Sequence, residues 1–445
     1  MFRARGCTRE SEARYVPTPA MSTPPAASAP QSSVGCPFCG LLCDDLTVEL
    51  AAGAPIVASR GCGKSRQLFA LADDGPAGAR VDGREATTEI ALARAAEILR
   101  AASQPLLLTA GIDVAGMRAL LELADRTGAV VDHANADAMF RNLLVLQDGG
   151  WISTTLTEVR NRADLLVSAG TDIVGRFPRF FERCFGDAQA MFVDGEREAW
   201  FLGAAPAGLP DSIARRATAI AVDRARLGEI FATLRALEAG KALGVAHVAG
   251  VPRERLEVLL ARMRAARYGV LAWAAADLDF PHAELAIQGM CELVKALNAK
   301  GRFAALPLGG TDGDVTAMQV STWQSGYPLR VSFAGGAPVF DPVRYRARRM
   351  LEAGEADAVL FVSALDPACA PPASDAPTIV LGRPGTRSQQ AAVFVPLATP
   401  GIHHAGHLYR TDSVVAVRLR KLADTRHLSA ARALSAILRA IGDGR

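Results

Sequence analysis

The sequence of 445 residues lacks the features that would link it to a membrane or to nucleic acid. No apolar run reaches the roughly 18 residues that a membrane-spanning helix needs. The net charge is only +3 and no run is rich in Lys and Arg, so nothing indicates a nucleic-acid surface. The first twenty residues mix both charge signs and lack the apolar segment of a secretory signal. We therefore expect a cytoplasmic protein.

The N-terminal region has the composition of a disordered segment. Residues 17–34 are rich in Pro, Ser and Ala, which predicts a disordered tail over residues 1–34. Met21 is a candidate for the true start of translation. The first twenty residues would then not belong to the protein.

Cysteine is scarce outside one short segment. Four of the eight cysteines lie between residues 36 and 62, and the others are scattered: Cys7, Cys184, Cys291 and Cys369. A secreted protein held by disulfides would have its cysteines spread densely along a shorter chain. The distribution therefore indicates a reducing compartment and one local metal site. Cys184, Cys291 and Cys369 are expected to be small buried hydrophobes.

The clustered cysteines are Cys36, Cys39, Cys43 and Cys62, with the spacing C-x2-C-x3-C-x18-C. Thiolates so close in sequence can converge on a soft metal centre. Three close cysteines and a distant fourth favour a 4Fe-4S cluster, whereas zinc usually takes two C-x2-C pairs. Zinc and a set of cysteines that no longer binds metal are the alternatives. The segment around Cys62 is not a phosphate-binding loop, because Ala58 replaces the first glycine of that motif.

Beyond residue 80, short apolar runs alternate with amphipathic helices. Helices are predicted over residues 87–102, 115–127 and 282–299. A short strand is expected where apolar residues alternate at Leu46, Val48 and Leu50. The remaining predicted strands are almost wholly apolar, as in parallel sheets buried on both faces: residues 105–109, 129–132, 163–168, 190–193, 268–273, 303–306, 358–362, 378–381 and 393–395. This alternation predicts Rossmann-like βαβ units, with ligands bound beyond the carboxyl ends of the strands.

Residues 36–45, Cys-Pro-Phe-Cys-Gly-Leu-Leu-Cys-Asp-Asp, resemble the opening of the B subunit of formylmethanofuran dehydrogenase, within the molybdopterin oxidoreductase superfamily. The resemblance continues in family order through residues 146–148, 157–164, 322–328 and 401–412. It implies an α/β fold that resembles formate dehydrogenase, with a small N-terminal Fe-S lobe and two Rossmann-like, doubly wound domains. The C-terminal β-barrel of the superfamily is absent at this length.

The patterning and the resemblance together predict a domain organisation after the tail. The Fe-S cluster lobe is expected over residues 35–75. One Rossmann-like domain is interleaved, from residues 76–200 and 335–425, and the second covers residues 201–334. A C-terminal helix is expected over residues 426–445.

In metal-bearing members of this family, a cysteine or selenocysteine followed by histidine binds molybdenum or tungsten held by a pterin. It lies just upstream of the segment that matches residues 146–148, and the matching positions here are Ala138 and Met139. Ala138 has no donor atom, and the thioether of Met139 is a weak, uncharged ligand. No cysteine lies between Cys62 and Cys184, and the nearest other donors are His133 and Asp137. The resemblance thus implies no catalytic residue, and no molybdopterin or tungstopterin.

This loss resembles the bacterial branch of the family, in which the B subunit is part of a formyltransferase/hydrolase complex with A (amidohydrolase-like), C and D subunits. Such complexes serve tetrahydromethanopterin-linked one-carbon metabolism, from formaldehyde to formate. We therefore expect a non-catalytic B subunit without its own metal-pterin redox site. One alternative is an active Mo/W-pterin formylmethanofuran dehydrogenase subunit. The retained cysteines suggest another, an electron-transfer or assembly subunit stabilised by a cluster.

Four further sets of side chains each have two interpretations. Lys64 matches a cofactor-binding lysine between cluster and pterin in relatives, or is a solvated lysine. The histidine set could bind zinc or lie in a loop that faces the pterin. The aromatic set could line the pterin pocket or pack in the core. The arginine set could contact a pterin phosphate or a partner's carboxylates, or form a solvated or interface basic face. These three sets are His403, His404 and His407; Trp323, Gln324 and Tyr327; and Arg176, Arg179 and Arg183.

Overall fold

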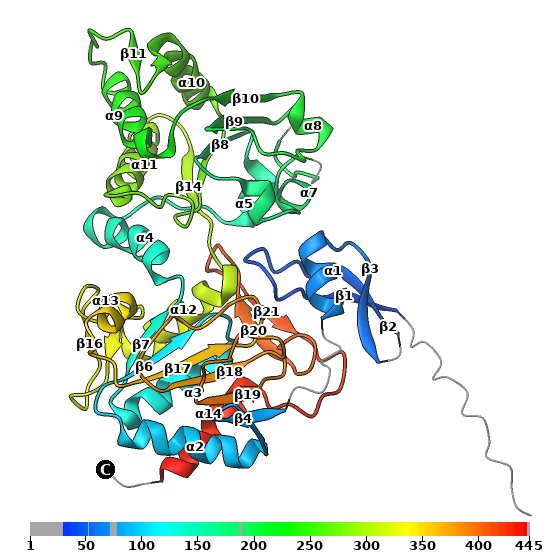
Figure 1. Ribbon diagram of the computed structural model, residues 1–445. Helices are drawn as coiled ribbons and strands as arrows, with labels where there is room; N and C mark the ends of the chain where they lie inside the picture. Colours follow the sequence, from blue (N-terminus) through cyan, green and yellow to red (C-terminus); the bar gives the residue numbers. More distant parts are fainter. Residues whose placement is uncertain (1–29, 52, 72–77, 187–188, 194, 443–445) are drawn as a thin grey trace, which may run out of the picture.

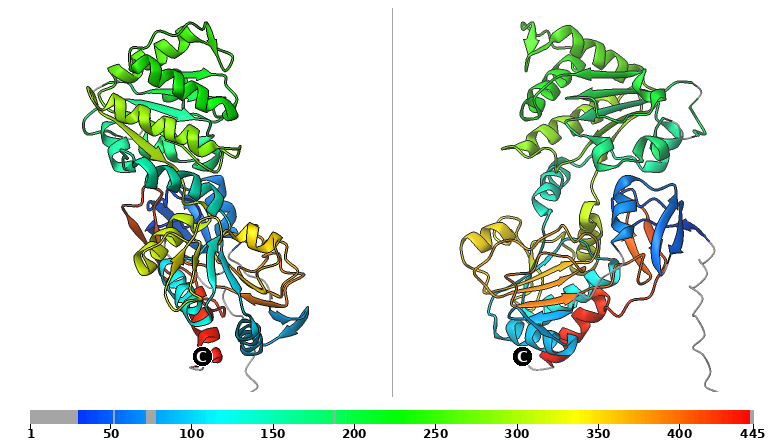
Figure 2. Two further views of the ribbon diagram at one scale, coloured as in Figure 1. Left: turned by 90° about the vertical axis from the view of Figure 1, so that its left-hand side faces the viewer. Right: turned by 45° about the vertical axis from the view of Figure 1, so that its right-hand side comes forward.

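The computed structural model describes residues 30–51, 53–71, 78–186, 189–193 and 195–442. It contains two large α/β bodies and a small lobe beside them (Figures 1 and 2). The larger body holds a nine-stranded sheet and the second body a five-stranded parallel sheet. The mixed α/β architecture predicted from the sequence is therefore confirmed. No helix in the described residues is long and apolar enough to cross a membrane.

The small lobe, called here the cysteine lobe, covers residues 30–71 without residue 52. It contains an antiparallel sheet in the order β1-β2-β3, followed by a helix: β1 (Gln31–Val34), β2 (Leu46–Ala51), β3 (Ala54–Ser59) and α1 (Gly63–Ala70). The strand predicted from Leu46, Val48 and Leu50 is confirmed. The predicted disordered tail extends too far, because Gln31–Val34 pairs with β2. Residues 1–29 of that tail lie outside the described residues, as does Cys7.

The nine-stranded sheet has a parallel centre of five strands in the order β7-β6-β17-β18-β19, flanked by antiparallel hairpins. In chain order the strands are β4 (Ala79–Val81), β5 (Arg84–Ala86), β6 (Pro105–Thr109), β7 (Val130–His133), β15 (Val331–Ser332), β16 (Val339–Phe340), β17 (Ala358–Ser363), β18 (Thr378–Gly382) and β19 (Val393–Pro396). Residues alternate between the two faces. One face packs on α2 (Thr88–Ala101), α3 (Val114–Thr127) and α14 (Ala430–Ile441), and the other on α13 (Ala347–Glu352).

The five-stranded sheet is parallel throughout, in the order β10-β9-β8-β13-β14: β8 (Leu165–Ala169), β9 (Glu198–Leu202), β10 (Ala217–Ile220), β13 (Gly269–Trp273) and β14 (Phe303–Pro307). Its first face packs on α9 (Leu227–Glu238), α10 (Arg253–Ala265) and α11 (Ala283–Leu297). Its second face packs on α5 (Leu156–Arg162), α7 (Phe180–Cys184) and the cysteine lobe. The lobe thus completes the hydrophobic core of this body.

Two connections join the large bodies. The first is α4 (Ala136–Gly149), which lies between them, and the second precedes α12 (Asp314–Ser325) (Figure 2). The hairpin of β20 and β21 lies between the larger body and the cysteine lobe (Figure 1). The remaining short elements are α6 (Ile173–Arg176), α8 (Asp211–Ala214), η1 (Arg224–Arg226), β11 (His247–Val248), β12 (Val251–Pro252), η2 (Thr311–Gly313), β20 (Gly406–Tyr409) and β21 (Ala416–Leu419).

One strand prediction is wrong, and one predicted boundary falls within a sheet. Residues 190–193 form no strand, and the apolar side chains of Met191 and Phe192 are exposed. The strand of this region is instead β9, Glu198–Leu202. The predicted boundary at residue 201 falls inside β9, because β8 and β9 pair with the strands of the second body. That body therefore begins before residue 201.

Gly40 gives a sharp test of how the cysteine lobe meets the connection between the two large bodies. A Cβ atom at residue 40 would lie 2.0 Å from the carbonyl oxygen of Gly309 and 3.1 Å from Cα of Gly310. Because backbone atoms cannot move aside as a side chain does, Gly40→Ala should destabilise the fold by about 1–3 kcal/mol. Thermal unfolding measures the effect. Gly63→Ala is the control, because nothing lies within 4 Å of its new Cβ, and an equal loss in both variants would contradict this contact.

Candidate functional site

An apolar cavity of about 120 Å³ lies between the two large bodies. It sits beyond the carboxyl ends of β13 and β14 and of β7, the edge where open α/β sheets bind ligands. Its walls come from α4, α12 and the loops that follow these strands. Its lining residues are Asn135, Ala138, Met139, Asn142, Leu143, Leu146, Trp151, Arg176, Phe177, Ala274, Ala275, Ala276, Pro307, Leu308, Gly309, Thr311, Asp314, Val315, Met318, Thr411 and Ser413.

The first turn of α4 brings Ala138 and Met139 into this wall. Ala138 is buried, and it contributes only a methyl group. The sulfur atoms among the lining residues belong to Met139 and Met318, and both are thioethers. No lining residue therefore offers an anionic sulfur ligand.

The charged groups of the wall are paired within the chain. The guanidinium of Arg176 donates to both carboxylate oxygens of Asp277, at 2.8 and 2.6 Å. Buried Asp314 accepts hydrogen bonds from Asn135 Nδ2 at 2.8 Å and from the backbone N–H of Gly310 at 2.6 Å. Burial raises the pKa of Asp314 to about 6 despite these bonds. These contacts fix the loops around the cavity.

The two donors nearest to Ala138 in sequence are engaged elsewhere. Buried His133 has Nε2 at 3.0 Å from the carbonyl oxygen of Asp312, and its Nδ1 accepts the backbone N–H of Asn135 at 2.9 Å. Burial lowers the pKa of His133 to about 4, so the ring is neutral near pH 7. Asp137 forms ion pairs with Arg330 and Arg346. Neither residue lines the cavity.

The four clustered cysteines come together at one end of the cysteine lobe. Cys36, Cys39 and Cys43 are buried, and Cys62 is half-buried. The backbone N–H of Cys36 donates to the carbonyl oxygen of Cys43 at 2.7 Å, which closes the loop that carries three of the thiols. Cys62 is the N-cap of α1, and its sulfur accepts the backbone N–H of Ser65 at 3.5 Å.

The thiols influence one another. Burial, followed by the charge of Cys39, raises the pKa of Cys36 well above its usual value, and Cys43 and Cys62 add to the effect. Burial raises the pKa of Cys43 to about 12, against the opposing effect of Arg183 and Arg179. The thiols of Cys36 and Cys43 are therefore neutral at pH 7 unless a cation displaces their protons.

Cations also lie near this group. Lys64 lowers the pKa of Cys39, although burial dominates and raises it overall. Within the described residues, no three His, Cys, Asp or Glu side chains are placed to hold a metal ion together. The four cysteines thus influence one another but do not form a ready-made metal site in this structure.

Similarity to known proteins covers most of the chain. No family model matches it. The B subunit of the formyltransferase/hydrolase complex of Methylorubrum extorquens is 31% identical over 335 residues, which is 74% of this chain and 87% of that protein. The B subunit of the tungsten-containing formylmethanofuran dehydrogenase 2 of Methanocaldococcus jannaschii is 28% identical over 413 residues, 88% of this chain and 93% of that protein.

The chain belongs to the family of these B subunits.

A solved structure supports the fold of this B-subunit family. A chain in the crystal structure of the formyltransferase/hydrolase complex of M. extorquens, determined with methylofuran, matches with a TM-score of 0.70 and 27% identity. The match covers 82% of this chain and 99% of that chain. The resemblance read from the sequence is therefore confirmed.

In this member of the B-subunit family, the aromatic segment does not line the cavity. Trp323 is 64% exposed, and Gln324 and Tyr327 are exposed as well. Arg118 lies over the ring of Trp323, with its guanidinium carbon 5.8 Å from the centroid. Trp323 lies near the C-terminal end of α12, and its side chain is exposed. It therefore fits neither the pterin-pocket nor the core-packing interpretation.

The three arginines singled out in this family member have separate roles. Arg176 lines the cavity, whereas Arg179 and Arg183 contact Asp44 and Asp45 of the cysteine lobe. The sequence could not reveal these partners, which lie more than a hundred residues away in the chain.

The three histidines of this family member lie in or beside the loop between β19 and β20. His403 is buried, and its Nδ1 accepts the backbone N–H of Thr399. Burial raises the pKa of Asp113, the buried N-cap of α3, and the nearby His404 and His407 oppose that rise. Asp113 is thus the nearby carboxylate that the sequence did not reveal. No three such side chains among the described residues are arranged to bind a metal ion.

Proposed function

We propose that this chain is the B subunit of a formyltransferase/hydrolase complex, in which it serves as a structural subunit without its own metal-pterin redox site. Its relatives are the B subunits of such a complex and of formylmethanofuran dehydrogenase. The observation that carries the proposal is Ala138, whose methyl group lines the cavity between the two bodies.

The physical reason lies in the chemistry of the ligand. The metal-bearing relatives that the sequence resembles place a cysteine or selenocysteine at this position, a soft anionic donor that alanine cannot replace. Met139 and Met318 offer uncharged thioethers. The cavity of about 120 Å³ is also smaller than the roughly 300–1,000 Å³ of typical cofactor pockets. The lining is therefore typical of an apolar space packed between two bodies, not of a metal-pterin pocket.

The partners follow from the same proposal. The matched complex contains subunits named A, B, C and D, and we infer that A, C and D subunits surround this chain, with A amidohydrolase-like. Formyl transfer and hydrolysis would then take place on partner subunits, within one-carbon metabolism from formaldehyde to formate linked to tetrahydromethanopterin. In the same proposal, the two large bodies are Rossmann-like domains and the cytoplasm is the site of action.

We also propose that Cys36, Cys39, Cys43 and Cys62 hold a 4Fe-4S cluster. Four thiols lie at one end of a small lobe, an N–H donates to one sulfur, and Lys64 acts on another. Three cysteines close together in sequence and a more distant fourth favour a 4Fe-4S cluster over a single zinc ion. Such a cluster would supply a one-electron centre and a cross-link within the lobe. Lys64 would offset part of its negative charge.

A second candidate role follows from those cysteines. A chain that retains four cluster ligands fits an electron-transfer or assembly subunit as well as an inert scaffold. The two roles differ in whether the cluster changes oxidation state during turnover. Spectra of the complex recorded with and without substrate separate them.

The proposed function is tested on the whole complex, isolated through an affinity tag on this chain. We expect partner subunits to co-purify, and the complex to release formate from a formylated methanofuran analogue without reducing a viologen dye. Met139→Leu should leave formate release within about twofold, because the thioether has no catalytic role in this account. Dye reduction that depends on the formylated compound, and that falls in the Met139→Leu complex, would overturn the proposal.

A further inference from the structure

The cysteine lobe is seated on the second large body through a shared hydrophobic core. Phe38, Leu46 and Phe69 of the lobe belong to the same buried cluster as Phe181 and Phe201 of that body. Together with α5 and α7, the lobe covers the face of the five-stranded sheet that α9, α10 and α11 leave open. Without the lobe, part of this apolar face would be exposed to water, which is unfavourable.

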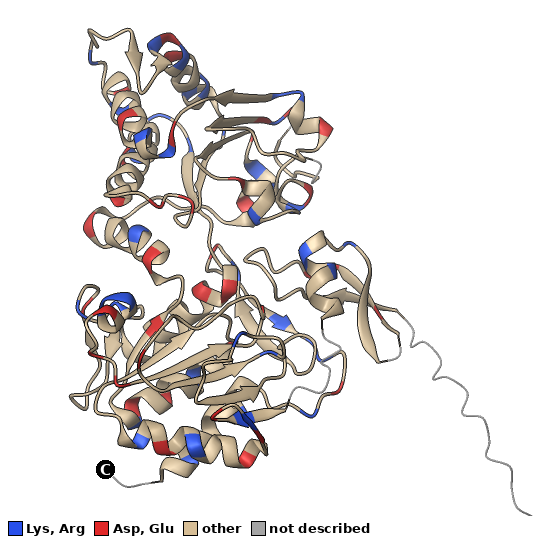
Figure 3. Ribbon diagram, in the orientation of Figure 1, with Lys and Arg blue, Asp and Glu red and all other residues tan. Residues whose placement is uncertain are grey.

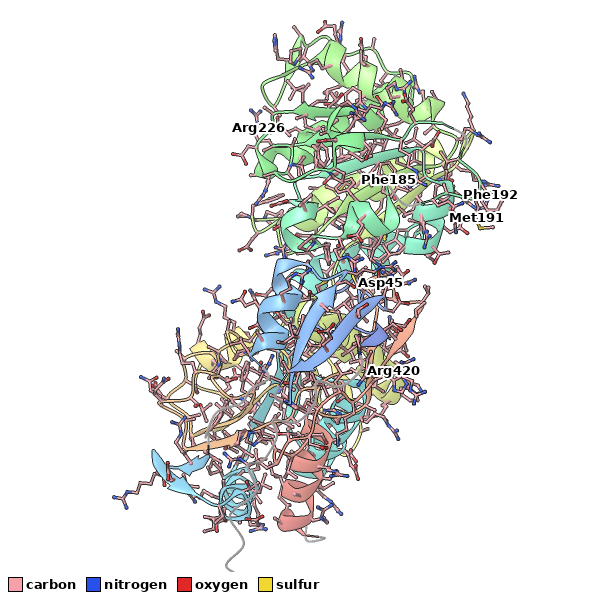
Figure 4. All side chains as sticks on the ribbon, turned by 90° about the vertical axis from the view of Figure 1, so that its right-hand side faces the viewer. Asp45, Phe185, Met191, Phe192, Arg226 and Arg420 are labelled. Atoms are coloured by element: carbon pink, nitrogen blue, oxygen red, sulfur yellow. The ribbon has the colours of Figure 1, made fainter. Side chains whose placement is uncertain are left out.

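Beside this core lies a set of ion pairs that we call the acid–arginine junction: Asp44, Asp45, Arg179 and Arg183. Both terminal nitrogens of Arg179 donate to the carboxylate of Asp45, each at 2.8 Å, and only 5% of Arg179 is exposed. Arg183 donates to Asp44 at 2.6 Å and also pairs with Asp45. In Figure 4, Asp45 lies at the edge of the lobe that faces the second body.

Charged residues of both signs are otherwise dispersed along the chain (Figure 3). The junction differs because Arg183 lies in α7 of one body, Arg179 is the N-cap residue of that helix, and the carboxylates come from the lobe. A bidentate Arg–carboxylate pair fixes both distance and orientation. Glu182 supports it, by accepting from Arg179 Nε at 2.8 Å.

We propose that the acid–arginine junction docks the cysteine lobe on the second body, and that filling the cysteine site tightens this docking. The second half rests on the proposed cluster. Asp44 and Asp45 directly follow Cys43, so a metal centre that fixes Cys43 also fixes the backbone of both carboxylates. Because Asp45 is held by Arg179, this constraint reaches α7, which supplies no ligand to the cluster.

Charge balance supports the coupling. Two carboxylates beside Cys43 would repel an anionic cluster bound by four thiolates. Arg179 and Arg183 pair with those carboxylates, and both also lower the pKa of the Cys43 thiol, against the larger opposing effect of burial. The positive charge of each arginine therefore attracts both the carboxylates and an anionic cluster in the cysteine site. Arg179 and Arg183 are positioning residues in this account.

The docking is tested on the full chain without iron. In Arg179→Gln, hydrogen exchange in β2 and β3 should become roughly ten- to a hundredfold faster, because a buried charged hydrogen-bond pair is lost. Arg226→Gln is the matched control, since it breaks the exposed pair with Glu229 in the same body. If Arg179→Gln does not fold, Arg183→Gln serves instead, because Arg183 is more exposed. Exchange equal to that of the control would overturn the docking.

The coupling is tested by loading iron and sulfide anaerobically and measuring iron content beside hydrogen exchange. In the unaltered chain, loading should slow exchange in residues 180–184 of α7 at least about threefold. In Arg179→Gln the slowing should disappear while iron still binds. Iron binding without any change at α7 would overturn the coupling and leave the cluster proposal intact. A chain that binds no iron would overturn the cluster, and the coupling with it.

Discussion

Replacing Cys36 and Cys43 by serine is expected to reduce bound iron from about four atoms per chain to fewer than one, because cluster irons need thiolate ligands. Both residues are buried in the lobe, so no other donor can approach from solvent. Iron and acid-labile sulfide, determined after anaerobic purification, measure the effect together with the visible absorption of the cluster.

The control for this experiment is Cys369→Ser. Cys369 lies outside the cysteine lobe, in the loop after β17, and is half-buried. Its removal should leave the iron content unchanged. If the double serine variant kept its iron, or if Cys369→Ser lost it equally, the four-cysteine assignment would be wrong.

Arg330→Met is expected to destabilise the fold by about 3–5 kcal/mol at pH 7, the usual loss when one partner of a buried ion pair is removed. Arg330 lies 3.5 Å from Asp132, and both side chains are almost wholly buried. It also pairs with Asp137 in the first turn of α4, and its guanidinium carbon lies 4.0 Å from the ring centroid of Phe140. The substitution should therefore loosen the helix that carries Ala138.

The loss in Arg330→Met should depend on pH in a defined direction. Burial raises the pKa of Asp132 from 3.8 to about 6, and the positive charge of Arg330 limits that rise. A carboxyl whose pKa is raised by folding makes the protein less stable as pH rises from the unfolded pKa through the folded one. Without Arg330 the folded pKa is higher still, so this decline extends to higher pH.

Unfolding free energies from denaturant titrations at about pH 5 and about pH 8 test this sign. The difference between Arg330→Met and the unaltered chain should be larger at the higher pH. Arg344→Met is the control, because Arg344 is exposed and close in sequence. A loss that is independent of pH would show that packing on Phe140, not the charge of Asp132, explains the effect.

Much of the sheet core could be predicted from the sequence. The apolar runs that became β6, β17 and β18 are uninterrupted, because these strands are buried on both faces. The strand predicted at residues 190–193 is wrong, because a run of four apolar residues does not by itself show that a neighbouring strand pairs with it. β9 was missed, since its sequence begins with a charged residue, Glu198, and contains Trp200, which hydrogen-bonds to Glu198.

From the sequence, the four candidate ligands could be proposed, but the residues that support the candidate site could not. Cys36, Cys39 and Cys43 could be grouped because they are close in the chain, and so could Cys62. The partners of Asp45 and Asp132, which are Arg179 and Arg330, lie more than a hundred residues away. A single sequence carries no signal for such pairs. The burial of Asp314 beside the cavity also depends on how the two bodies meet.

The most direct test is elemental analysis of the purified complex for molybdenum, tungsten and iron, normalised to this chain. The account predicts iron that depends on the four clustered cysteines, and molybdenum and tungsten at no more than trace levels. One molybdenum or tungsten atom for each copy of this chain, retained with a pterin, would contradict it. A residue with only a methyl group at position 138 would then be shown to suffice for such a centre.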